Sequence, residues 1–131
     1  MIALGADHAG YELKEEIKKY LDSKKIEYID CGTNSTESVD YPKFGYKAAK
    51  LVADKKCDKG ILCCGTGIGI SLAANKVKGI RAAVVSDEYC AEMTRRHNDA
   101  NIIALGGRVI DAKKAIKLVD IFLNTPFEGG K

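Results

Sequence analysis

The chain has 131 residues, a length that suits a single domain spanning 1–131. Hydrophobic residues make up 46 % of it and charged residues 30 %, and the net charge of +3 is too small to favour a nucleic-acid or membrane partner. No apolar run is long enough to span a membrane and no signal peptide is visible, so we expect a cytoplasmic protein.

Short apolar runs alternate with helical patterns along the chain. The runs predict strands at 1–6, 26–29, 60–63, 81–85 and 101–105. Apolar residues at helical spacing predict helices over 13–21, 44–52, 68–77 and 112–123, and a further helix that opens at 86–88. Asp40 is the expected N-cap of the second helix.

This alternation predicts an α/β fold, a three-layer αβα sandwich with a five-stranded parallel sheet between two layers of helices. We expect a Rossmann-like arrangement with the flavodoxin-like strand order. In such sheets ligands bind beyond the carboxyl ends of the strands where the order reverses, here between the first and third strands.

Two polar segments fall at that expected position. Residues 7–10 follow the first strand and residues 64–71 follow the third. Gly65, Gly67 and Gly69 can turn the backbone tightly and direct N–H groups to one point at a helix start, which predicts an anion cradle. The spacing matches neither the dinucleotide fingerprint nor the P-loop, and a tight turn shaped by sterics alone is the alternative.

Cys63 and Cys64 are adjacent, and successive side chains of a strand point to opposite faces. We expect Cys63 in the core and Cys64 at the strand end beside the glycine loop. A helix start favours a nearby thiolate, which could take a proton from carbon while the cradle holds the resulting oxyanion. The alternative is that both cysteines only fill the core.

The remaining candidates are weaker. The five cysteines form no CxxC pair and the histidines are His8 and His97, so we expect free thiols, no metal and no cofactor. His8 stands at a strand end, whereas His97 could simply belong to a polar helix end. Arg108 and Lys131 could bind phosphate or merely be solvated.

Taken together, these residues resemble those of the ribose-5-phosphate isomerase type B family, which also includes galactose-6-phosphate and allose-6-phosphate isomerases. The similarity runs nearly end to end in the same order. The matching segments are 5–10, 30–33, 40–42, 64–71, 73–76, 79–82, 97–101 and 128–130.

The resemblance implies aldose–ketose isomerisation of a sugar phosphate through an enediolate, without a metal, as in the pentose phosphate pathway. The roles it implies involve more residues than the motifs alone suggest. By similarity, Cys64 moves the proton, His97 opens the sugar ring with help from Asp7, and Thr66 completes the catalytic set. The oxyanion is held by the backbone of Gly65, Gly67, Ile68 and Gly69. Phosphate is bound by His8, Arg108 and Lys131, and the sugar site is lined by Tyr41 and Asn98.

Two departures refine the expectation. One branch of the family has a glutamate base where this chain has Ile70, so the chain resembles the cysteine branch. Family members usually continue past the final Gly-Gly with arginines, where this chain has Lys131. We therefore expect a weaker grip on phosphate from this end.

The resemblance, which makes both Cys64 and His97 catalytic, and the topology together predict a homodimer with shared active sites, with a tetramer left open. The fourth helix runs back from the carboxyl edge of the sheet, which leaves His97 far from the Cys64 loop of its own subunit. The alternatives are an isomerase of allose 6-phosphate or a related hexose phosphate, and a nucleotide-binding regulatory module without enzymatic activity.

Overall fold

The computed structural model describes residues 1–32 and 41–129, with only the backbone for residues 41–44. Its centre is an all-parallel five-stranded sheet, as the sequence predicts. The strands are β1 (Ile2–Ala6), β2 (Tyr28–Asp30), β3 (Lys59–Cys64), β4 (Ala82–Val84) and β5 (Ile102–Gly106). The register pairs Ala6 with Cys63 and Cys64 with Gly106, so β1, β3 and β5 end side by side.

The strand order corrects one expectation. The sheet runs β2-β1-β3-β5-β4, so the last two strands are exchanged relative to the flavodoxin-like order. The reason lies in their composition: β5 is buried along its whole length, whereas β4 is short and partly exposed. An apolar strand gains most in the centre of a parallel sheet, and a short one is tolerated at its edge. The predicted adjacency of β1 and β3 is confirmed.

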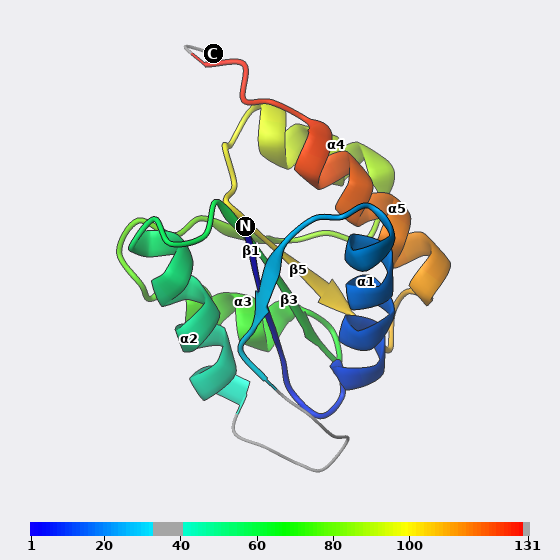
Figure 1. The fold of residues 1–131 in the computed structure, drawn as a ribbon. Coiled ribbons are helices and arrows are strands. Elements are labelled where there is room, and N and C mark those ends of the chain that lie inside the picture. Colours follow the sequence, from blue (N-terminus) through cyan, green and yellow to red (C-terminus); the bar gives the residue numbers. More distant parts are fainter. Residues whose placement is uncertain (33–40, 130–131) are drawn as a thin grey trace.

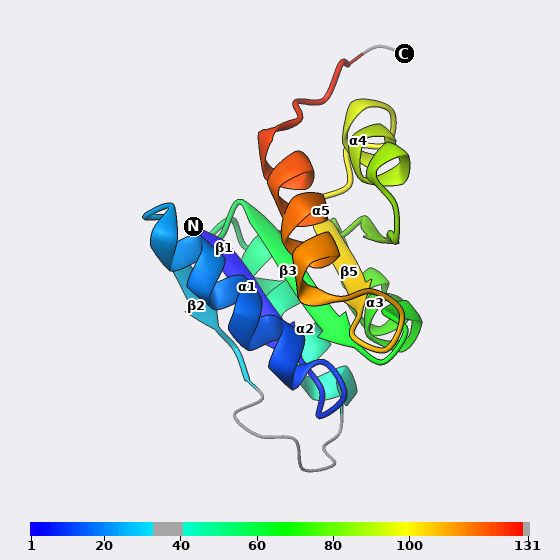
Figure 2. The ribbon, with the colours of Figure 1, turned by 90° about the vertical axis from the view of Figure 1, so that its right-hand side faces the viewer.

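Within the described part of the chain, five helices cover the two faces of the sheet. They are α1 (Tyr11–Ser23), α2 (Tyr41–Ala53), α3 (Ile68–Asn75), α4 (Glu88–Arg96) and α5 (Ala112–Asn124). Figures 1 and 2 show α2 and α3 on one face and α1, α5 and α4 on the other, which gives the predicted three layers. Because the chain steps back from β4 to β5, a right-handed crossover puts α4 next to α5.

The core consists of two clusters that the sheet separates. One contains Leu13 and Ile17 of α1 with Phe122 of α5, and the other contains Val52 of α2 with Ile70 of α3. These are the apolar positions that the helical spacing predicts. None of the described helices is long and apolar enough to cross a membrane.

Element ends differ from prediction by a few residues. Lys25 has a left-handed φ of 58° and Ile26 N–H donates to Leu21 O (2.9 Å), so this closing turn of α1 delays β2 to Tyr28. The N-cap of α4 is Asp87, whose side chain accepts a hydrogen bond from Cys90 N–H, as the polar opening predicts. The expected cap at Asp40 lies outside the described residues.

Candidate active site

The segments after β1, β3 and β5 meet at the carboxyl edge of the sheet. There they line an open hollow of about 410 Å³. Its lining comprises Asp7, His8, Ala9, Cys64, Gly65, Thr66, Ile68, Gly69 and Arg108. The structure therefore brings together most of the predicted site residues in one place, although they come from three separate parts of the chain.

Cys63 and Cys64 separate as strand alternation predicts. Cys63 is fully buried in the cluster beneath α1 and α5, where burial raises the pKa of its thiol. Cys64 belongs to the cluster on the other face and lines the hollow. The N–H of Gly67 donates to Cys64 Sγ at 3.1 Å, so the loop holds this sulfur at the site.

The glycine loop forms the start of α3. Gly67 adopts a left-handed φ of 88°, and a Cβ there would lie 3.2 Å from the backbone of Leu105, so glycine suits both conformation and space. Of the predicted cradle donors, Gly67 N–H binds Cys64 Sγ and Ile68 N–H binds Thr66 Oγ1 (3.1 Å). Gly69, in the first turn of α3, has no earlier helical carbonyl to bind.

Asp7 shapes the turn after β1. Its Oδ1 accepts hydrogen bonds from the N–H groups of Ala9 (2.9 Å) and Gly10 (3.0 Å), and the residue is buried. One carboxylate oxygen is therefore engaged in holding the loop that presents His8. The resemblance implies that Asp7 helps His97 to open the sugar ring. Within one subunit, Asp7 lines the hollow and His97 does not.

His8 and Arg108 add polar groups with unused hydrogen-bonding capacity. Within residues 1–32 and 41–129, His8 Nδ1 is the buried side-chain nitrogen or oxygen that lacks a partner. A buried orphan of this kind is unusual unless a ligand or water completes it. Arg108 lies against Gly65: its Cδ and Nη1 would each be 3.6 Å from a Cβ added there. An imidazole and a guanidinium thus share the hollow with Cys64.

Sequence reasoning missed the Gly106–Gly107 pair, which locks the loops together. Gly107 N–H donates to Cys64 O (2.7 Å), and a Cβ on Gly106 would come within 2.7 Å of the Thr66 backbone. The signal was visible as two glycines directly after the strand predicted at 101–105. Because glycine has no Cβ, the backbone after β5 can lie directly against the backbone after β3, and this contact positions the loop that carries Cys64.

Gly10 makes an equally close contact, and its replacement tests the packing. A Cβ at Gly10 would lie 2.2 Å from Cys63 O, so Gly10→Ala must displace α1 or β3. We expect a loss of about 1–3 kcal/mol in the free energy of unfolding, measured by urea titration. Gly65→Ala is the matched control, because its Cβ would meet nothing closer than 3.6 Å. Equal stability of the two variants would contradict this contact.

His97 and Asn98 lie at the opposite, amino edge of the sheet. His97 caps the end of α4, is 55 % exposed, and has Nε2 4.0 Å from Glu128 Oε1. Asn98 precedes β5 and accepts a hydrogen bond from Arg81 Nε through its carbonyl (3.1 Å). Neither residue lines the hollow around Cys64.

Two predicted site residues cannot be placed. Lys131 lies outside the described residues, and Tyr41 begins α2 but its side chain is not described. Among the described residues, no group of three or more His, Cys, Asp or Glu side chains is arranged to hold a metal ion.

Comparison with known proteins identifies one family of sugar-phosphate isomerases. A model of the ribose/galactose isomerase family matches residues 2–131. The ribose-5-phosphate isomerase B of Escherichia coli K12 is 48 % identical over 130 residues, which cover 99 % of this chain and 87 % of that protein. The Clostridium thermocellum ribose-5-phosphate isomerase B has a similar structure, with a TM-score of 0.97 at 55 % identity over 98 % of this chain and 87 % of the other. The Mycoplasma genitalium ribose-5-phosphate isomerase B, solved with bound ribulose-5-phosphate, has a TM-score of 0.93 at 42 % identity, over 98 % and 86 % of the two chains.

Proposed function

Because this chain belongs to the ribose/galactose isomerase family, we propose that it interconverts ribose 5-phosphate and ribulose 5-phosphate. The observation that carries the proposal is one hollow containing a held thiol, an orphaned imidazole nitrogen and a guanidinium. Residues 1–131 form the isomerase domain, and the free cysteines suit a reducing cytoplasm.

The phosphate end of the substrate is bound by His8 and Arg108. A guanidinium offers a phosphate several N–H donors in a fixed plane, which gives both charge and orientation. The buried, unpartnered Nδ1 of His8 supports a polar ligand beside it, because leaving such an atom unpaired is costly. These contacts would position the sugar chain over the Cys64 loop.

Cys64 carries the proton. Its thiolate takes the proton from C2 of the open-chain aldose, and the C2–H electron pair forms the double bond of a 1,2-enediolate. The O2 hydroxyl proton then passes to O1, the thiol returns its proton to C1, and the C2–O2 bond becomes the carbonyl of the ketose. C2 is oxidised to a carbonyl and C1 is reduced to an alcohol within the same molecule, so no external oxidant, reductant or cofactor is needed. Gly67 N–H, 3.1 Å from Sγ, provides a hydrogen bond to negative charge on the sulfur.

The enediolate oxygen lies at the start of α3 in this mechanism. Helix N-termini present N–H groups without helical partners together with a partial positive charge. Since Gly67 and Ile68 direct their N–H groups to Cys64 and Thr66, the first turn around Gly69 is the better donor to substrate. Preorganised donors of this kind stabilise charge that develops in the transition state.

Ring opening is assigned to His97 of a second subunit, and we therefore propose a homodimer with shared active sites. Ile68 and Leu72, one turn apart on α3, are 54 % and 60 % exposed, and Ile68 also lines the hollow. A second copy that covered these apolar side chains would approach the Cys64 loop from the side. Asn98 would then reach the sugar together with His97.

The direct test is a coupled assay of ribose 5-phosphate against allose 6-phosphate with a strong chelator present. We expect higher kcat/KM with the pentose phosphate, and activity that survives chelation, because proton transfer is assigned to Cys64 alone. Preference for the hexose phosphate would favour the related isomerases. Nucleotide binding without turnover of either sugar would favour the regulatory module, and a loss of activity that added zinc restores would contradict the metal-free mechanism.

A further inference from the structure

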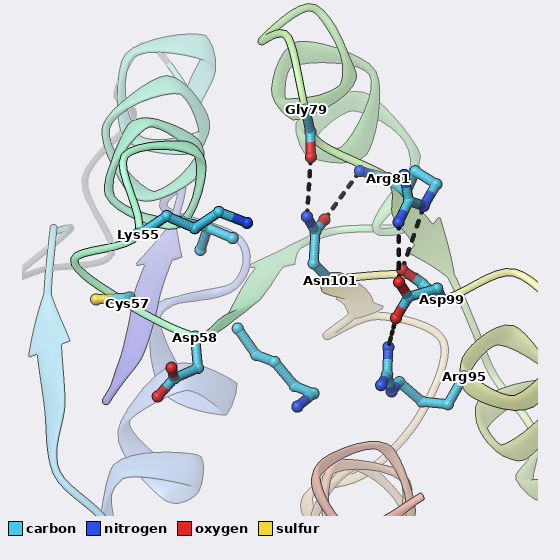
Figure 3. A pocket seen from close by; sticks show the side chains of 10 residues that line it. Lys55, Cys57, Asp58, Gly79, Arg81, Arg95, Asp99 and Asn101 are labelled. Carbon is cyan, nitrogen blue, oxygen red and sulfur yellow. Dashed lines mark hydrogen bonds and ion pairs between the residues drawn. The ribbon is translucent and has the colours of Figure 1, made fainter. Parts of the chain in front are cut away.

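A second cavity lies at the amino edge of the sheet, away from the proposed active site. Its volume is about 360 Å³, within the range of small-molecule sites. Figure 3 shows its charged side chains arranged around a shared space; they come from the turn after α2, the start of β3, the last turn of α4 and the segments before β4 and β5. Lys55, Lys59, Arg81 and Arg95 line it together with Asp58 and Asp99.

The two carboxylates of this cavity are already neutralised. Asp58 Oδ2 lies 2.7 Å from the amino terminus. Asp99 is bridged by Arg95 Nη1 on one oxygen (2.7 Å) and by Arg81 Nη2 on the other (3.1 Å). One of the two guanidinium charges on Asp99 is left unbalanced, and the charges of Lys55 and Lys59 remain as well. The side-chain ammonium groups of these two lysines form no hydrogen bond or ion pair with the described residues.

Lys59 is the more constrained of the two lysines. It opens β3, is partly buried, and faces a cavity that Arg95 also lines. Burial and the positive charge of Arg95 lower the pKa of the Lys59 ammonium. An ammonium held in a concave site beside another cation, with its neighbouring carboxylates occupied, is stabilised when an anion enters.

The walls around these lysines are fixed. Asn101 Nδ2 donates to Gly79 O (2.9 Å) and its Oδ1 accepts from Arg81 N–H (2.9 Å). Arg95 Nε donates to Thr125 O at 3.0 Å. A preorganised site loses little entropy when it binds a ligand, so the two lysines can act on an anion without a large rearrangement.

We propose that this cavity is a second anion site, which takes a small phosphate-bearing molecule. The site goes beyond the proposed isomerase function, because it lies at the other edge of the sheet and uses none of the residues around Cys64. Phosphate fits the chemistry since two flexible ammonium groups can each donate several hydrogen bonds to its oxygens.

The cavity adjoins the turn formed by residues 97–99, because Asp99 lines it. Asp99, with a left-handed φ of 50°, is held by the same Arg81 and Arg95 that line the cavity. Arg81 Nε also binds the carbonyl of Asn98 (3.1 Å). A bound anion would therefore lie beside the groups that hold the turn carrying His97.

The test is a titration of ¹⁵N-labelled protein with inorganic phosphate, followed by amide chemical shifts, with sodium chloride at matched ionic strength as the reference. We expect the amides of Gly79 and Asn101 to shift with phosphate and not with chloride. Residue-resolved shifts separate this site from any binding at Gly65 and Gly69. Because no turnover is measured, failure of this proposal is distinguishable from failure of the isomerase proposal.

Three variants make the result decisive. Lys55→Met and Lys59→Met together should weaken phosphate binding at Gly79 and Asn101 by about tenfold or more, since each removes a charged hydrogen-bond donor. Lys56→Met removes the same charge from the neighbouring residue, which does not line the cavity, and should leave the shifts unchanged. If the double variant fails to fold, Lys55→Met alone serves, because Lys55 is exposed. Equal shifts with chloride, no shift at Gly79 and Asn101, or equal weakening by Lys56→Met would each overturn the proposal.

Discussion

Replacement of Cys64 with alanine is expected to stop exchange of the C2 hydrogen of ribose 5-phosphate with solvent. The loop that follows β3, residues 65–67, contains no other titratable side chain. Alanine also leaves the Gly67 N–H without the sulfur to which it donates. Loss of a positioned proton carrier costs about 10²–10⁴-fold in rate. The measurement is deuterium incorporation at C2 by NMR, together with kcat.

Cys63→Ala provides the matched control, because it removes the same thiol from the adjacent residue on the other face of the sheet. We expect near wild-type exchange and a loss of about 1 kcal/mol in the free energy of unfolding, from a small cavity beneath α1 and α5. Exchange at a near wild-type rate in Cys64→Ala would mean that another group carries the proton.

Mixed dimers of two inactive variants are expected to recover activity. Cys64→Ala and His97→Asn are unfolded and refolded together. If each site combines Cys64 of one subunit with His97 of the other, a mixed dimer has one site with both changes and one with neither. Random pairing makes half of the dimers mixed, so about a quarter of wild-type activity should return.

The controls for this experiment are each variant refolded alone, and differently tagged chains that prove mixed dimers form. A refolded mixture that contains mixed dimers and stays inactive would show that each subunit supplies its own histidine. The packing of α4 against α5 would then have to differ from the arrangement in Figure 1. In this arrangement His97 ends α4 and does not line the hollow around Cys64.

Much of the fold could be predicted from local patterns. The strands and helices of the described residues follow from apolar runs and helical spacing. The placement of Cys63 and Cys64 on opposite faces of the sheet follows from the alternation of side chains along a strand. The gathering of residues 7–10 and 64–71 in one hollow required only that β1 and β3 be neighbours in a parallel sheet.

Other features depended on contacts between distant segments. The exchange of β4 and β5 is one of them, because the choice between two allowed strand orders depends on how the whole sheet packs. The direction of a single N–H group, such as that of Gly67 towards Cys64 Sγ, depends on the backbone torsion angles of the loop. Glycine allows many such angles, so the glycine spacing alone does not predict this direction.

Local sequence patterns were enough to predict which elements form and which of Cys63 and Cys64 lines the hollow, because both follow from the periodicity of side chains along one element. Tertiary structure alone decided the order of β4 and β5, the locking of the β3 loop by Gly106 and Gly107, and the cavity around Lys55 and Lys59. Those features arise where segments far apart in the chain touch, and the free energy of such contacts depends on the whole packed arrangement rather than on any one segment.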